Sequence, residues 1–225
     1  MVIKSLLVSH VEKSIAQAEE LTSKLKPEVL QVQGWSAPKF RHFLNNLCSK
    51  ADTKYLEIGV WKGATHIAAL YKNEIYSIAV DNFSEHWDET GYPVDFGEVD
   101  NSELEIFKQN CINHLGSVPT ILDMDFLEAQ KTLPLNNFNV YFYDGNHSAE
   151  DQALALTQFL PNMANEFVFI VDDWNWDGPK IGTEQALLST GVSITFRQEL
   201  PAAYPGDVDQ WWNGVAIFVL QKKVK

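Results

Sequence analysis

The sequence predicts an α/β fold built on a doubly wound, mainly parallel sheet. Short apolar runs, typical of buried strands, alternate with stretches of helical periodicity over most of the chain. Strands that alternate with helices form parallel sheets covered on both faces. The alternation of strands and helices stops near the end of the sequence, where the apolar runs at residues 192–198 and 214–221 have no helix between them. These two runs predict a C-terminal antiparallel strand pair at the edge of the sheet.

Two helices are expected before the sheet begins. Residues 8–26 carry apolar side chains at helical spacing, and Pro27 is expected to end that helix. A second helix is expected over residues 38–49. A chain of 225 residues suits one large domain. We therefore expect a single domain, with N-terminal helices over 1–50 and the sheet-containing core over 51–225.

The core is expected to hold about five parallel strands before the terminal pair. The predicted strands are the apolar runs at residues 55–58, 75–80, 120–122, 140–143 and 167–171. The predicted helices between them cover residues 64–71, 102–115, 148–160 and 181–189.

Composition and charge narrow the class of partner. No apolar run approaches the ~20 residues of a membrane span, and the opening apolar stretch is too short for a secretory signal. Cys48 and Cys111 imply no disulfide framework and suit a reducing cytoplasm. The formal net charge of −13 repels nucleic acid and anionic membrane surfaces. We expect a cytoplasmic protein whose partner is a small molecule or a metal ion, with no nucleic acid and no membrane, and a homo-oligomer is compatible with this.

The loop after the first predicted strand is typical of a nucleoside-binding site. Ligands of such sheets bind where the strands end and strand order reverses. Gly59 would let the chain turn sharply, and Gly63 would let the next helix and a ligand approach closely. The second strand ends in Asp81, about 20 residues after Gly59, where a carboxylate can bind both hydroxyls of a ribose. The simpler alternative is that the two glycines only end a strand and open a helix.

The other residues of this loop decide between nucleoside ligands. A dinucleotide loop needs a second glycine so that the backbone can contact the pyrophosphate, and Trp61 occupies that position. Glu57 would repel a phosphate but attract the ammonium group of an amino acid. A ligand with a ribose and an amino-acid end, but no phosphate, is S-adenosylmethionine.

The pattern Glu57-x-Gly59-x-x-x-Gly63, followed by an acidic end of the second strand, resembles class I S-adenosylmethionine-dependent methyltransferases. The resemblance covers about residues 35–221, including the antiparallel last strand, and implies a Rossmann-like fold. It implies cofactor contacts at the ends of three strands: Glu57, Gly59, Gly63 and Thr65 around the methionine end, Asp81 at the ribose, and Asp125 and Phe126 beside the adenine.

Carboxylates follow two further predicted strands. Asp144 comes after residues 140–143, and Asp172 and Asp173 come after residues 167–171. One strand–helix–strand return separates them, so their side chains should meet on one rim of the sheet. Like charges at close range are costly unless something neutralises them, and a divalent cation such as Mg²⁺ would do so. The alternative is a trio of solvated carboxylates.

The segments Tyr143-Asp144-Gly145-Asn146-His147-Ser148 and Val171-Asp172-Asp173-Trp174 resemble a narrower group. They are similar to metal-dependent O-methyltransferases that act on sugars of antibiotics, and to cephalosporin-hydroxylase-like proteins of the same fold. The resemblance implies that Asp144, Asp172 and Asp173 hold Mg²⁺ or another divalent cation, which binds the acceptor's oxygens. The group's second acidic residue, its base, is replaced here by Asn146, so the sequence departs from the pattern at the proton-removal step.

His147 is the substitute base that we nominate, and Asp144 is counted with it as catalytic. Histidine titrates near neutral pH and can remove a proton from a hydroxyl group. The alternative role for His147 is to cap or position the helix that begins near residue 148.

Aromatic residues stand among acidic ones in three places that could hold an acceptor. They are Trp87, Tyr92 and Phe96 in the loop over residues 82–101, Trp174 and Trp176 after the proposed metal pair, and Tyr204, Trp211 and Trp212 in the last hairpin. Rings among carboxylates suit a sugar, a phenol or an amine. For Trp211 and Trp212 we expect ordinary hydrophobic cover.

These observations favour a methyltransferase that uses S-adenosylmethionine to methylate an oxygen of a small hydroxylated acceptor, with divalent metal assistance. The missing acidic residue leaves an alternative, a hydroxylase-like or catalytically silent cofactor-binding module of the same fold. A third function, a nicotinamide oxidoreductase, is disfavoured by Trp61.

Overall fold

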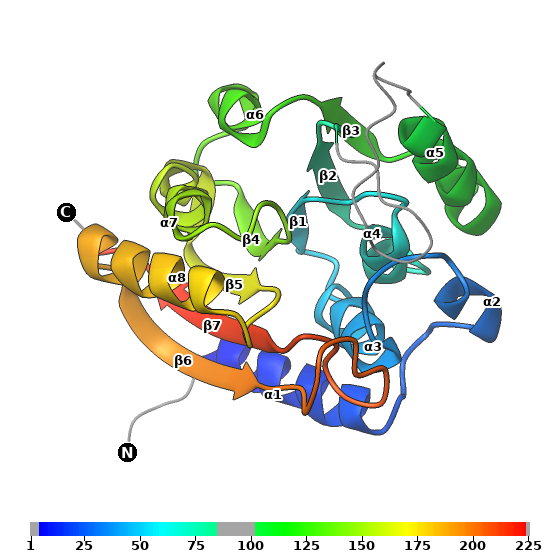
Figure 1. Ribbon diagram of the computed structural model, residues 1–225, viewed down its shortest axis with the longest axis horizontal. Helices are drawn as coiled ribbons and strands as arrows, with labels where there is room; N and C mark the ends of the chain where they lie inside the picture. Colours follow the sequence, from blue (N-terminus) through cyan, green and yellow to red (C-terminus); the bar gives the residue numbers. More distant parts are fainter. Residues whose placement is uncertain (1–4, 85–101, 224–225) are drawn as a thin grey trace.

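The computed structural model describes residues 5–84 and 102–223, and its centre is one seven-stranded sheet (Figure 1). The strands are β1 (Lys54–Ile58), β2 (Tyr76–Asp81), β3 (Thr120–Asp123), β4 (Phe138–Tyr143), β5 (Met163–Val171), β6 (Ser193–Leu200) and β7 (Val215–Gln221). Their order across the sheet is β3-β2-β1-β4-β5-β7-β6. The order reverses between β1 and β4, which is where ligands of doubly wound sheets bind.

The strand pairing confirms the predicted fold. The pairs β2–β3, β1–β2, β1–β4 and β4–β5 are parallel, whereas β7 pairs antiparallel with both β5 and β6. The parallel strands are buried because helices cover both faces, and this explains their near-continuous apolar sequences. The C-terminal antiparallel pair lies at the sheet edge, as the absence of an intervening helix indicates.

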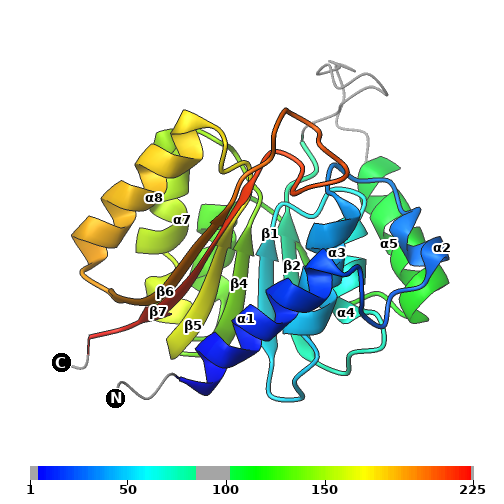
Figure 2. The same ribbon diagram turned by 90° about the horizontal axis from the view of Figure 1, so that it is seen from below.

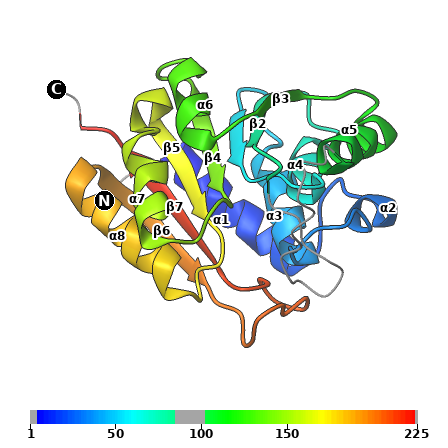
Figure 3. The same cartoon turned by 45° about the horizontal axis from the view of Figure 1, so that its top comes forward.

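Helices cover the two faces of the sheet in two groups (Figure 2). One face is covered by α6 (Phe126–Thr132), α7 (Ala149–Thr157) and α8 (Asp177–Thr190), and the other by α1 (Leu6–Glu19), α3 (Pro38–Leu47) and α4 (Ala64–Leu70). Two further helices, α2 (Pro27–Leu30) and α5 (Ser102–Leu115), pack beside α4. Figure 3 shows α7 and α8 side by side on the first face. A short 3-10 helix, Leu160–Asn162, precedes β5.

Two helix boundaries differ from the sequence-based expectation. The first helix, α1, ends at Glu19 rather than near residue 26, and Leu21 lies in the left-handed region at φ 51°. Pro27 does not end a helix but occupies the first turn of α2, where its missing N–H costs nothing. Helix α6 was not predicted, although Asp125 caps it by accepting a hydrogen bond from the Leu127 amide.

The loops at the carboxyl ends of the parallel strands share one edge of the sheet. The connection between β6 and β7 reaches the same edge, from which the β5–α8 connection also leaves (Figure 2). Cys48 and Cys111 are both buried and free. Among the described residues, no helix is long and apolar enough to cross a membrane.

Candidate active site

A cavity of about 1010 Å³ opens along this edge of the sheet. Its volume lies at the upper limit of ordinary ligand pockets, about 300–1,000 Å³, so it has room for a cofactor and a second small molecule. The residues at the ends of β1 and β2 form one end, which we call the cofactor end. The residues that follow β4 and β5, together with the β6–β7 connection, form the acceptor end.

Both glycines of the β1–α4 loop have a positive φ, and at both positions a side chain would collide with neighbouring protein atoms. Gly59 has φ +82°, and a Cβ atom there would lie 1.9 Å from the carbonyl oxygen of Asp144. Gly63 has φ +91°, and its missing side chain makes room for the Phe107 ring of α5, 2.9 Å from the Cβ position. Gly59 lines the cavity, whereas Gly63 does not. Only Gly59 is therefore placed beside a ligand.

Glu57 points into the protein interior rather than into the cavity. Its side chain is completely buried and is not among the residues that line the cavity. The carboxylate accepts hydrogen bonds from the Tyr55 hydroxyl at 2.7 Å, the Thr65 hydroxyl, and His66 Nδ1 at 2.9 Å. Glu57 therefore ties β1 to the first turn of α4. Thr65 itself lines the cavity.

Asp81 lies in the cavity wall and fixes the shape of the glycine loop. One carboxylate oxygen accepts the backbone N–H groups of Val60 and Trp61, both at 2.8 Å, and the other accepts that of Phe83 at 2.8 Å. Burial raises the pKa of Asp81, and these three hydrogen bonds oppose that rise. Trp61 adopts φ +42°, an uncommon conformation for a bulky residue. The carboxylate thus stabilises the loop and also faces the cavity.

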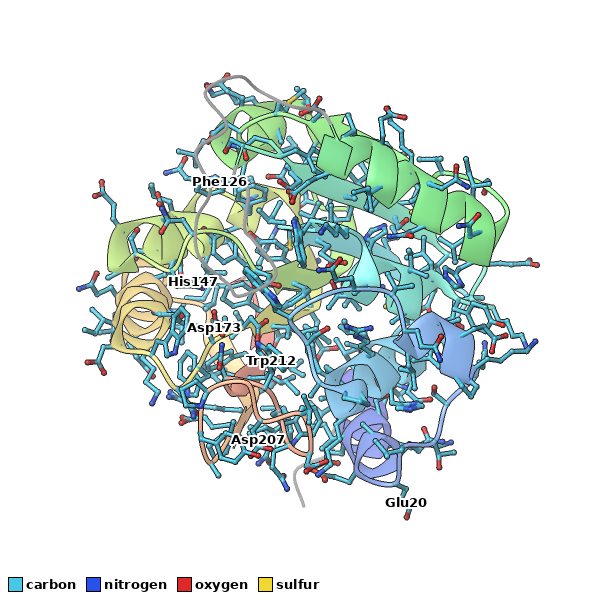
Figure 4. The ribbon with its side chains drawn as sticks, turned by 45° about the vertical axis from the view of Figure 1, so that its right-hand side comes forward. Glu20, Phe126, His147, Asp173, Asp207 and Trp212 are labelled. Atoms are coloured by element: carbon cyan, nitrogen blue, oxygen red, sulfur yellow. The ribbon has the colours of Figure 1, made fainter. Side chains whose placement is uncertain are left out.

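The next strand end, after β3, supplies an apolar slot beside Asp81. Met124, Asp125 and Phe126 all line the cavity. The Phe126 ring makes an edge contact with Tyr143, at 5.8 Å between centroids, and Figure 4 shows it on the α6 side of the cavity. This is the place expected for an adenine ring, and the assignment remains a prediction.

The three aspartates after β4 and β5 come together, as predicted. Asp144, Asp172 and Asp173 all line the acceptor end, and Asp172 and Asp173 are each 5% exposed. Burial, and then the negative charges of Asp172 and Asp173, raise the pKa of Asp144 well above its usual range. Burial and the charge of Asp173 likewise raise the pKa of Asp172. Asp144 and Asp172 therefore each disfavour the ionised form of the other, and of the three aspartates only Asp173 has a basic side chain, His147, beside it in the described part of the chain.

The arrangement of these carboxylates is not that of a ready metal centre. Within residues 5–84 and 102–223, no group of three or more His, Cys, Asp or Glu side chains is placed to hold a metal ion. Asp173 is engaged by His147 on one side and by the Asn213 side chain on the other. Asp144 and Asp172 share a hydrogen bond with each other. The aspartates as placed do not fit a divalent cation, and the metal site stays a prediction.

His147 faces the acceptor end and is oriented by a carboxylate. Its Nε2 lies 3.0 Å from Asp173 Oδ2, and its ring meets that of Trp176 edge-on at 5.0 Å between centroids. Figure 4 shows His147, Asp173 and Trp212 in one region of the molecule. The capping alternative for His147 is wrong, because Ser148 caps α7 by accepting a hydrogen bond from the Asp151 amide at 3.0 Å.

The aromatic residues divide between cavity wall and core. Trp176 and Trp212 line the acceptor end. Trp211 is 2% exposed, packs against Phe43 and donates a hydrogen bond to Glu19, so hydrophobic cover is the role that its contacts indicate. Trp174 is also buried, away from the cavity lining. The predicted loop aromatics Trp87, Tyr92 and Phe96 lie outside the described residues.

Sequence reasoning missed one wall of the cavity, formed by residues 34–36 before α3. Trp35 lies over Trp61 with 5.0 Å between ring centroids. The segment is held by the buried guanidinium of Arg41, which donates to the carbonyls of Val32 and Gly34 and to the Ser36 hydroxyl. Burial lowers the pKa of Arg41 to about 10. The sequence contained one signal for this wall, which is Arg41 within an amphipathic helix. A buried guanidinium needs hydrogen-bond acceptors nearby, and the segment before the helix supplies them.

A family model described as a methyltransferase domain matches residues 56–174. The match begins inside β1 and ends just after Asp172 and Asp173, so it contains the glycine loop and all three aspartates of the acceptor end. A comparison with curated proteins gives no match.

Solved structures share the fold at low sequence identity. TrmN from Thermus thermophilus superposes with a TM-score of 0.59 at 12% identity, over 87% of this chain and 52% of its own. This chain therefore spans about half the length of that protein. Cofactor-bound Rv0187 from MTB (TM-score 0.55, 14% identity) covers 99% of this chain and 93% of its own. The O-methyltransferase from Bacillus cereus in complex with SAH (0.53, 14%) covers 98% and 93%.

Proposed function

The chain belongs to the methyltransferase-domain family, whose members depend on S-adenosylmethionine, and we propose that it methylates a hydroxyl oxygen of a small acceptor. One observation carries the choice of oxygen. His147, oriented by Asp173 at 3.0 Å, faces the acceptor end of the cavity that also contains the glycine loop. A hydroxyl nucleophile must lose its proton during transfer, and a positioned histidine is suited to accept it.

The contact with Asp173 also assigns the atoms of the proposed base. If Nε2–H donates to the Asp173 carboxylate, the lone pair of the neutral ring is on Nδ1, which would take the acceptor's proton. The His147–Asp173 pair resembles other base–carboxylate pairs, in which the carboxylate holds the imidazole in one tautomer and stabilises its charged form.

The cofactor end would serve to position the donor. S-adenosylmethionine supplies a methyl group on a positively charged sulfur. Gly59 and Thr65 stand at the proposed methionine end, Asp81 at the ribose, and Phe126 beside the adenine. Glu57 would act through Thr65 rather than by direct contact, because its carboxylate is buried. In transfer, the acceptor oxygen forms its bond to carbon as the carbon–sulfur bond breaks, and that electron pair stays on sulfur. Alignment of the two reactants is the protein's main contribution.

Two solved structures with the same fold support the proposal of O-methyl transfer as the reaction class. The Bacillus cereus neighbour is an O-methyltransferase in complex with SAH, and the neighbour from MTB holds a cofactor. Mg²⁺ held by Asp144, Asp172 and Asp173 would acidify an acceptor hydroxyl. Because these side chains as placed do not fit a cation, the proposed proton transfer uses His147 alone.

The proposal is tested first by calorimetry with S-adenosylhomocysteine and NAD, each with Mg²⁺ and with EDTA. We expect micromolar binding of S-adenosylhomocysteine, about −8 kcal/mol, and no binding of NAD. Binding of NAD alone would reject the proposal. The second test is a screen of hydroxylated and amino acceptors with labelled S-adenosylmethionine. Product labelled on nitrogen or carbon, with no oxygen product, would overturn the choice of oxygen. Cofactor binding without any transfer would favour a catalytically silent module.

A further inference from the structure

The ionisable side chains of the cavity wall are almost all acidic. Seven carboxylate side chains line it: Asp81, Glu103, Asp125, Asp144, Asp151, Asp172 and Asp173. Among the residues that the structure describes, no lysine or arginine lines it, and His147 is the one residue there that can become a cation near neutral pH. A ligand carrying a carboxylate or phosphate would enter this cavity against a repulsive field.

Part of this negative charge is already used by the protein at the cofactor end. Asp81 accepts three backbone hydrogen bonds, and Asp125 caps α6. The carboxylates there therefore stabilise the loop and a helix terminus. The remaining charge at that end suits the cofactor, whose sulfonium and ammonium groups are cationic.

At the acceptor end, the charge of the Asp144–Asp172 pair is not balanced by a basic side chain. In the described part of the chain, neither Asp144 nor Asp172 forms a salt bridge with a basic residue. Asp172 is 5% exposed and lines the cavity, and its Oδ1 atom has no hydrogen-bond partner. A buried acceptor atom without a partner is unfavourable, so a donor supplied by a ligand would recover that free energy.

Two tryptophans complete the acceptor end. Trp176 is 42% exposed and meets His147 edge-on, and Trp212, from the β6–β7 connection, also lines the cavity. The connection is held in place by Asn213, whose side chain accepts a hydrogen bond from the Gly206 amide at 2.8 Å and also bonds Asp173. The faces of tryptophan rings attract organic cations, most strongly where water is excluded.

From these observations we infer that the acceptor is a hydroxylated amine, whose protonated nitrogen binds Asp172 and Asp144 between the rings of Trp176 and Trp212. An ammonium group donates to the unpartnered Asp172 oxygen and balances the negative charge that the hydrogen-bonded Asp144–Asp172 pair retains. A neutral alcohol would donate a hydrogen bond but would bring no positive charge. A carboxylate would bring neither a hydrogen-bond donor nor a positive charge. This inference rests on the proposed function, because it names the substrate class of the same site.

The test uses three matched phenols that differ in one terminal group: tyramine, which is cationic, 4-hydroxyphenethyl alcohol, which is neutral, and 4-hydroxyphenylacetate, which is anionic. Each is titrated by calorimetry into the full chain saturated with S-adenosylhomocysteine, in EDTA and low salt. We expect tyramine to bind at least about tenfold more tightly than the alcohol, the scale of one charge-assisted hydrogen bond. The anion should not bind measurably.

Two variants assign the preference to the proposed atoms. Asp172→Asn should bring tyramine down to the affinity of the neutral alcohol. Asp209→Asn removes the same charge from the exposed part of the same β6–β7 connection, outside the cavity lining, and should leave the preference unchanged. Trp212→Leu should weaken tyramine more than the alcohol, because the ring acts on the charge.

Several results would overturn the inference. They are equal affinity for the three phenols, tighter binding of the anion, or no binding of any phenol to the cofactor-loaded chain. Binding of tyramine only after Mg²⁺ replaces EDTA would also overturn it, and would assign the aspartates to a metal. Failure of the proposed function is distinct, because it would appear already as absence of S-adenosylhomocysteine binding to the unmodified chain.

Discussion

The two ends of the cavity hold their carboxylates in opposite ways. At the cofactor end, Asp81 in the cavity wall accepts three hydrogen bonds from the chain itself, and so does Glu57, which is buried in the interior beside the cavity wall residue Thr65. At the acceptor end, Asp144 and Asp172 face each other, and Asp172 keeps one buried oxygen without a partner. Both ends are acidic and both lie at strand ends, yet the protein satisfies Asp81 fully and leaves Asp172 with a free buried oxygen.

This difference separates the carboxylates that stabilise the fold from those that the fold leaves with an unsatisfied oxygen. A carboxylate that accepts several internal hydrogen bonds supports the fold and presets the loop that carries it. Carboxylates that repel each other weaken the fold and persist where function needs them. Neutralising a carboxylate should therefore have opposite effects on stability at the two ends.

The largest effect is expected for the base at the acceptor end. His147→Ala should lower the rate of methyl transfer by about 10²–10⁴-fold, because the acceptor's proton then has no positioned base. S-adenosylhomocysteine affinity should stay unchanged, because its proposed contacts are at the cofactor end. Steady-state kinetics and calorimetry measure the two quantities. His114→Ala, outside the main cavity, is the matched control. A variant that retains full turnover would remove His147 from the mechanism.

Glu57→Ala should lower the free energy of unfolding by about 3–5 kcal/mol, since it leaves three buried donors without their acceptor. Chemical denaturation monitored by circular dichroism measures this. Glu74→Ala, an exposed position, should stay within about 0.5 kcal/mol of the unmodified chain. A stable Glu57→Ala protein that binds cofactor poorly would instead indicate direct contact between Glu57 and the ligand.

Asp81→Ala should weaken S-adenosylhomocysteine binding by about 1–3 kcal/mol, because the ribose loses its acceptor and the glycine loop loses its anchor. Calorimetry at fixed pH provides the comparison. Asp123→Ala is a close control, because Asp123 pairs with Asp81 in the sheet but does not line the cavity. Equal losses in both variants would mean that general charge, not Asp81, holds the cofactor.

The smallest effect is expected to have the opposite sign. Asp172→Asn should raise the free energy of unfolding by about 0.5–2 kcal/mol at neutral pH, because burial and the charge of Asp173 both disfavour an ionised Asp172, whereas the amide stays neutral. Its thermal unfolding midpoint, measured without ligand and in EDTA, should exceed that of Asp209→Asn. Destabilisation by Asp172→Asn would show that the acceptor end, too, is satisfied internally, and the contrast between the two ends would fail.

Local sequence patterns predict the order of the elements and the positions of the polar strand ends. Apolar periodicity is local, so the strands, the antiparallel last pair and the span of α5 over residues 102–115 could be predicted from it. The carboxyl ends of parallel strands share one edge, so Asp81, Asp144, Asp172 and Asp173 could be brought to one cavity before any coordinates were known.

The direction of each side chain and its contacts depend on how the elements pack against one another. Glu57 turns inward because Tyr55, Thr65 and His66 surround it, and no spacing rule gives that direction. In the same way, Trp211 packs on α3 while its neighbour Trp212 lines the cavity. These outcomes depend on partners far apart in sequence, and local periodicity carries no information about such partners.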